Sequence, residues 1–119
     1  MCAVSPAGDR IYVIKHGYEK VITMATDGTL ISTFMDPELQ EPMGVHVTPS
    51  GQVLVCGYSS NTVIQVDCEG RKKLATLVPS KDGVLNPVSV CYNTKTDQII
   101  VGLSDNSIIK VMELQKKHP

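Results

Sequence analysis

The histidine and cysteine side chains of this sequence are candidate zinc ligands. The three histidines, His16, His46 and His118, are far apart in the chain, and the four cysteines form no CxxC pair. Zinc sites usually take paired ligands at short spacing, so the sequence predicts no metal site and no cofactor. Serine, histidine and aspartate are all present but form no GxSxG motif, so no catalytic residue is predicted.

The four cysteines are Cys2, Cys56, Cys68 and Cys91. Each lies in or beside an apolar run, which is typical of reduced thiols in a protein core. If residues 58–61 form a hairpin turn, Cys56 lies opposite a residue near Val63. Cys68 then lies about five residues further along, roughly 16 Å away at ~3.3 Å per residue, which is beyond the reach of a disulfide.

Composition and charge describe an ordinary globular chain. Its 119 residues are 42% hydrophobic and 19% charged, and 11 basic against 12 acidic residues give a net charge of -1. This balance does not support RNA as a partner, because most nucleic-acid binders carry a strongly basic surface. No apolar run is long enough to span a membrane, and the start of the sequence does not resemble a signal peptide. We therefore expect a soluble cytoplasmic protein with no membrane partner.

Internal repetition is the strongest pattern in the sequence. Three pairs of segments are similar: 4–8 and 47–51, 21–28 and 63–70, and 61–66 and 106–111. Their spacing of 42 to 45 residues indicates one unit that occurs almost three times.

Each unit reads as four short strands separated by turns. In the middle unit we predict strands at residues 44–48, 52–57, 62–67 and 71–77. Residues 53–56 are apolar without alternation, so both faces of the sheet must be covered. Asn61 precedes the third strand, where it fits the left-handed conformation of a turn.

Four-stranded antiparallel repeats of about 40 to 45 residues, buried on both faces, are typical of β-propellers. We therefore predict an all-β fold, a partial β-propeller of almost three four-stranded antiparallel blades. Blade 1 covers about residues 1–40, blade 2 about 41–85 and blade 3 about 86–114, followed by a polar tail at 115–119. Pro42 and Pro87 are expected just before the first strands of their blades.

Residues 61–66, followed by Gly70, and residues 43–55 before them resemble the NHL repeat. The whole chain is similar to the NHL propeller at the C-terminal end of TRIM-family proteins, and more closely to the divergent invertebrate members, especially those of bivalves. It departs from that pattern at 15–19, which replace the turn that usually carries an asparagine. The resemblance implies the C-terminal portion of a propeller of about six blades. It also implies a role in presenting protein or RNA partners to an upstream ubiquitin-ligase portion.

The loops that join second to third strands, and each outer strand to the next inner strand, share one rim of a propeller, which is its usual ligand face. The predicted ligand-binding residues on this rim are Tyr18, Tyr58, Ser59, Asn61, Lys81 and Asn106. Tyr18 and Tyr58 are the expected anchors, since a fixed aromatic ring offers large contact area, although they could instead pack over the blade tops. Asn61 and Asn106 also fit a purely structural role in turns.

Three functional hypotheses follow. The first is a non-catalytic recognition module, not an enzyme by itself, with a protein as its partner. The second is a metal-dependent propeller hydrolase or lyase. It would need polar ligands on the first strands, where the chain has Ala3, Val45, His46 and Ser89. The third is a structural half-propeller that self-associates or is completed by other blades, because an open ring exposes apolar sheet faces.

The one basic cluster, residues 71–73, is expected to be solvated.

Overall fold

A computed structural model describes residues 1–15, 17–78, 84, 86–104 and the backbone of 109–113. This part of the chain forms eleven strands and no helix. The strands are β1 (Cys2–Val4), β2 (Arg10–Ile14), β3 (Val21–Ala25), β4 (Leu30–Phe34), β5 (Pro42–Val47), β6 (Val53–Gly57), β7 (Thr62–Val66), β8 (Lys73–Val78), β9 (Pro87–Asn93), β10 (Gln98–Leu103) and β11 (Ile109–Glu113). A search of the described residues finds no helix of the length and apolarity needed to cross a membrane.

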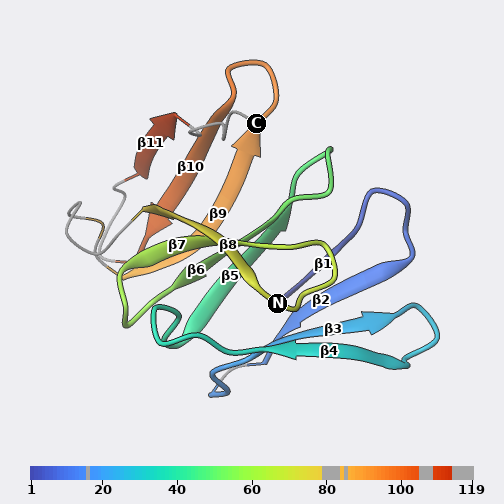
Figure 1. The fold of residues 1–119 in the computed structure, drawn as a ribbon. Helices are drawn as coiled ribbons and strands as arrows, with labels where there is room; N and C mark the ends of the chain where they lie inside the picture. Colours follow the sequence, from blue (N-terminus) through green and yellow to red (C-terminus); the bar gives the residue numbers. More distant parts are fainter. Residues whose placement is uncertain (16, 79–83, 85, 105–108, 114–119) are drawn as a thin grey trace.

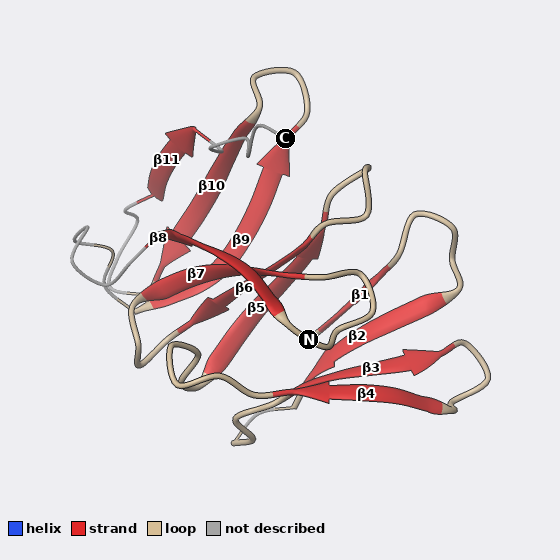
Figure 2. Ribbon diagram, in the orientation of Figure 1, coloured by secondary structure: helices blue, strands red, loops and turns tan. Residues whose placement is uncertain are grey.

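The strands form three antiparallel sheets in chain order, which we call blades 1, 2 and 3. Blade 1 contains β1 to β4, blade 2 contains β5 to β8, and blade 3 contains β9 to β11. Blade 2 lies between the other two, and the innermost strands β1, β5 and β9 are neighbours in space (Figures 1 and 2). The predicted all-β, partial-propeller architecture is therefore confirmed.

Both faces of blade 2 are buried because a neighbouring blade covers each of them. Val53 and Val55 point into the core between blades 1 and 2, together with Tyr12, Phe34 and other apolar side chains. Leu54 and Cys56, the alternate residues of the same strand, point into the core between blades 2 and 3. Successive side chains of a strand point to opposite faces, so one continuous apolar strand serves two cores.

The turn predictions hold, and the strand limits shift by one or two residues. Cys56 pairs with Val63 as expected, and Asn61 has a φ of 55°. The outer strand begins at Lys73 rather than at residue 71, because the amides of Arg71 and Lys72 both donate to Asp67 Oδ1 and prolong the turn.

Two further expectations need correction. Pro42 and Pro87 do not precede the first strands but begin them, a position where a proline is tolerated.

Only Cys56 is a core thiol, and its burial raises its pKa to about 11. Cys2, Cys68 and Cys91 are exposed, because Cys68 lies in a turn and the other two lie on sheet faces that no blade of the described chain covers.

The inner strands of blades 2 and 3 approach each other closely at Gly44. A Cβ atom at this position would lie 2.9 Å from Ser89 Cα and 3.0 Å from the backbone oxygen of Val88. Both contacts are with the main chain of β9, so no side-chain rotation relieves them. The absence of a side chain at residue 44 therefore lets two blades pack at the propeller axis.

We predict that Gly44→Ala destabilises the fold by about 1–3 kcal/mol, the usual effect of overpacking a core. Urea unfolding followed by circular dichroism measures this loss. Thr94→Ala, in an exposed turn, is the control and should change the unfolding free energy by less than about 0.5 kcal/mol. Equal midpoints for both variants would show that the blades can separate at Gly44 without cost.

Candidate functional site

The rim predicted from the sequence exists as a set of hydrogen-bonded loops. We define it as residues 15–20, 35–41 and 58–61 together with Asn86, excluding residue 16, which lies outside the described residues. The amide of Tyr58 donates to the Glu41 carbonyl at 2.9 Å, and that of Ser59 donates to the Gln40 carbonyl at 3.1 Å. These bonds hold the β6–β7 turn against residues 35–41, which we call the connector between blades 1 and 2.

Asn61 joins this turn to the start of blade 3. Its Oδ1 accepts from the amide of Asn86 at 2.8 Å, and Asn86 Nδ2 donates to the Tyr58 carbonyl at 3.1 Å. Asn61 also adopts the left-handed conformation that asparagine tolerates better than most residues. Its side chain is therefore engaged within the protein, in agreement with the turn interpretation.

Two shallow pockets open on the rim and share Glu19; together we call them the rim groove. The smaller, of about 180 Å³, is lined by Gly17, Tyr18, Glu19, Glu41, Pro42 and Met43. The larger, of about 290 Å³, is lined by Glu19, Met35, Asp36, Pro37, Leu39 and Gln40. Small-molecule sites usually measure about 300–1,000 Å³, so each pocket suits a single side chain of a partner better than a cofactor.

The rim groove combines exposed apolar surface with negative charge. Tyr18 is 47% exposed and Met35 is 63% exposed. Lys15 Nζ lies 4.6 Å from the centre of the Tyr18 ring, a cation–π contact that favours one ring orientation. The lining residues include the carboxylates of Glu19, Asp36 and Glu41 and no basic side chain. The groove can therefore accept hydrogen bonds from a cationic group beside an apolar contact.

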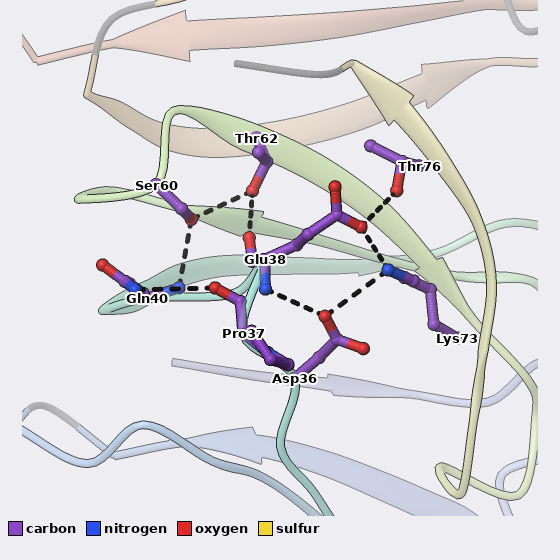
Figure 3. A network of polar contacts seen from close by, with 8 residues as sticks. All are labelled: Asp36, Pro37, Glu38, Gln40, Ser60, Thr62, Lys73 and Thr76. Atoms are coloured by element: carbon purple, nitrogen blue, oxygen red, sulfur yellow. Dashed lines mark hydrogen bonds and ion pairs between the residues drawn. The ribbon is translucent and has the colours of Figure 1, made fainter.

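A polar network holds the connector between blades 1 and 2 onto blade 2 (Figure 3). Lys73 Nζ on β8 contacts both Asp36, at 3.4 Å, and Glu38, and Thr76 Oγ1 donates to Glu38 Oε1 at 2.8 Å. The hydrogen bond from Lys73, followed by that from Thr76, holds the pKa of Glu38 below its usual value. The same hydrogen bond raises the pKa of Lys73.

Backbone groups of the connector are bound to blade 2 as well. Thr62 Oγ1 donates to the Glu38 carbonyl at 2.6 Å, and the amide of Gln40 donates to Ser60 Oγ at 3.0 Å. The connector that lines the rim groove is therefore positioned by β7 and β8, as Figure 3 shows. Lys73 was expected to be a solvated edge residue; it is instead half-buried in this network, because the connector lies against its strand.

Four of the six predicted ligand-binding residues lie on the rim: Tyr18, Tyr58, Ser59 and Asn61. Lys81 and Asn106 lie outside the described residues. Of the four, only Tyr18 lines the rim groove, while Ser59 Oγ donates to the Glu41 carboxylate. Their binding role stays a prediction.

Sequence reasoning missed Glu19, Asp36 and Glu41. The signal was available. Residues 35–41 connect the outer strand of one repeat to the inner strand of the next, so they belong to the rim by the same rule that selected Lys81, and Glu19 lies in the loop that supplied Tyr18.

His46 lies half-buried on β5, and burial lowers its pKa. In the part of the chain that the structure describes, no group of three or more histidine, cysteine or acidic residues is placed to hold a metal ion.

Comparison with known proteins supports the fold. No family model matches the chain, and no curated protein matches its sequence. Hydrazine synthase from Kuenenia stuttgartiensis is similar with a TM-score of 0.77 and 17% identity, over 94% of this chain and 31% of that one. A luciferin-regenerating enzyme is similar with a TM-score of 0.66 and 18% identity, over 89% of this chain and 38% of that one. Both have propeller-like folds, and the chain spans about a third of the length of each.

We predict that Asn61→Ala lowers stability by about 1–3 kcal/mol, because alanine tolerates the left-handed conformation less well than asparagine and because the change removes the acceptor of the Asn86 amide. Asn61→Gly loses the same acceptor but tolerates the backbone conformation, so it should cost less. Thermal unfolding of both variants measures the difference. If the two variants lose equal stability, the left-handed conformation is not what selects asparagine here.

We also predict that acid releases the connector. Because the folded-state pKa of Glu38 is depressed, its contribution to stability is complete above the ordinary carboxyl pKa of 4.5 and is lost as the pH falls through the depressed value. The effect on unfolding should stay within about 1 kcal/mol, since the pair is partly exposed. The amide NMR shift of Gln40 during a pH titration reports it. Glu38→Gln should remove that transition, while the matched change Glu69→Gln, in an exposed turn, should leave it in place.

Proposed function

We propose that this chain is a non-catalytic recognition module that binds a segment of a partner protein at the rim groove. The observation that carries the proposal is the rim groove itself, in which the exposed ring of Tyr18 lies beside Pro42, Met43 and the carboxylates of Glu19 and Glu41. A rigid sheet scaffold that presents such a loop surface is a common arrangement for binding.

The charge of the rim groove selects the chemistry of the partner. Of the three lining carboxylates, Asp36 already contacts Lys73, and Lys15 lies over the Tyr18 ring. Glu19 and Glu41, whose Oε1 accepts from Ser59, would therefore take the head of a partner lysine or arginine, with its alkyl stem on the apolar surface. The same carboxylates repel phosphate groups, so a protein segment is favoured over RNA.

The resemblance to NHL propellers of TRIM proteins extends the proposal to a biological role. There the module would hold a substrate for a ubiquitin-ligase portion of a larger protein. This role rests on the sequence resemblance at residues 43–55 and 61–66 and requires the remaining blades of a full ring.

The alternative is a metal-dependent propeller enzyme. Both structural neighbours are enzymes by name, and His46 lies on an inner strand, where a propeller could expose it to the axis. No specific arrangement of described residues favours this alternative over recognition.

A peptide array tests the proposal. Peptides with a central Lys or Arg between apolar residues should bind more strongly than peptides with Ala or Glu at the same place. Tyr18→Ala should weaken binding of the best peptide about tenfold, or ~1.4 kcal/mol, in fluorescence polarisation, while Tyr18→Phe keeps most of it. Lys95→Ala, in an exposed turn away from the rim, is the control. Preference for Glu peptides, or stronger binding to single-stranded RNA, would contradict the proposal.

A further inference from the structure

Blade 1 has one face that no other blade of the described chain covers. The cross-strand register places Cys2, Val13, Ile22 and Thr33 in one row across this face. A second row contains Val4, Ile11, Met24 and Leu30, of which Val4 is 52% and Leu30 is 61% exposed. Neither row contains a charged residue. A contiguous apolar sheet face of this kind normally marks an interface.

Blade 3 has a complementary open face. The register places Cys91 opposite Ile100 and Ser89 opposite Gly102, while Val90 and Val101 on the other face are buried against blade 2. The side chains described on this open face are small or apolar at its centre. The three described blades therefore form a row with one open face on each side.

The contacts between blades 1 and 2 and between blades 2 and 3 show how such an open face is covered by a neighbouring blade. In each blade, one residue of the inner strand pairs with a valine of the second strand: Cys2 with Val13, Val45 with Val55, and Val90 with Val101. Val45 and Val90 are buried against the preceding blade, so Cys2 occupies the equivalent position on a face with no preceding blade.

On each inner strand, the residue after the one just named faces the following blade instead of the preceding one. Ala3, His46 and Cys91 each pair with the residue next to that valine, which is Tyr12, Leu54 or Ile100. Ala3 packs in the core toward the following blade, and Leu54, opposite His46, also faces the following blade. Cys91 therefore points toward the place of the next blade, as Cys2 points toward the place of the previous one.

We propose that two copies of this chain join head to tail, with the open face of blade 1 in each copy packed on the open face of blade 3 in the other. The same kinds of face already pack twice within one chain, so the new contact continues an existing interface. Propellers close with about 4–8 blades, and two copies supply six. A two-fold axis makes both new contacts identical and closes the ring. This inference concerns sheet faces and is independent of the rim groove.

In such a ring, Cys91 of one copy and Cys2 of the other lie on adjacent inner strands and face one interblade core, as Ala3 and Val45 do within the chain. A short bismaleimide, which adds to one thiol at each end, should therefore convert the 119-residue chain to a covalent dimer on a denaturing gel. Mass spectrometry should identify a Cys2–Cys91 link. Cys2→Ser and Cys91→Ser should each abolish the dimer band, whereas Cys68→Ser, at a thiol that is also exposed but lies in a turn, should retain it.

Light scattering after size-exclusion chromatography supplies the second measurement. The wild-type chain should have twice the mass of one chain, and Val4→Glu should reduce it to the mass of one chain with an unchanged circular dichroism spectrum, because Val4 is half-exposed in the single chain. Thr94→Glu adds the same charge in an exposed turn and should remain dimeric.

Three results would overturn the proposal: a wild-type monomer at tens of micromolar, an open series of larger oligomers, or crosslinking that persists in Cys2→Ser. A monomer without crosslinks would assign the open faces to blades of a different chain or of a longer form of this one. If Val4→Glu fails to fold, the crosslinking result on the wild-type chain still decides.

Discussion

Blade 2 is buried on both faces, and the rest of the structure depends on that constraint. β6 has Val53 and Val55 in one core and Leu54 and Cys56 in the other, so a single strand belongs to two interblade cores at once. Such a sheet has no face for solvent, so another layer must cover each side, and in the described chain the neighbouring blades do so. Each blade therefore buries apolar side chains against its neighbour.

Hydrogen bonds and ion pairs between neighbouring blades fix the orientation of one blade relative to the next. The turn between β7 and β8 reaches back to blade 1, where Tyr12 Oη donates to the Cys68 carbonyl at 2.5 Å and Ser32 Oγ donates to the Glu69 carbonyl at 2.6 Å. The connector before β5 is held by Lys73, Thr76 and Thr62 of blade 2. Apolar burial is non-directional, so these bonds fix how one blade sits on the next and thereby shape the rim groove.

The rim and the sheet faces offer two kinds of binding surface with different chemistry. The rim groove is small, partly acidic and formed by loops, which suits one side chain of a partner. The open faces of blades 1 and 3 are broad and made of strands, and their described centres carry no charge, which suits another sheet. A propeller separates these roles because its loops lie at the rims, whereas its strand faces are buried against neighbouring blades.

The sequence alone determined the strand repeat, the all-β class and the turn at Asn61, because apolar periodicity and turn chemistry act within a few residues. It also indicated that β6 is covered on both faces, since an unbroken apolar strand has no polar side. Only the tertiary structure decided that Cys2 and Cys91 are exposed while Cys56 is buried, because burial depends on which blade covers a face and not on the local apolar run. The pairing of Lys73 with Glu38 was likewise decided by the tertiary structure, since these residues are 35 positions apart and only blade packing brings them together. The sequence could place Glu19, Asp36 and Glu41 on rim loops, but only the tertiary structure brings them to one groove.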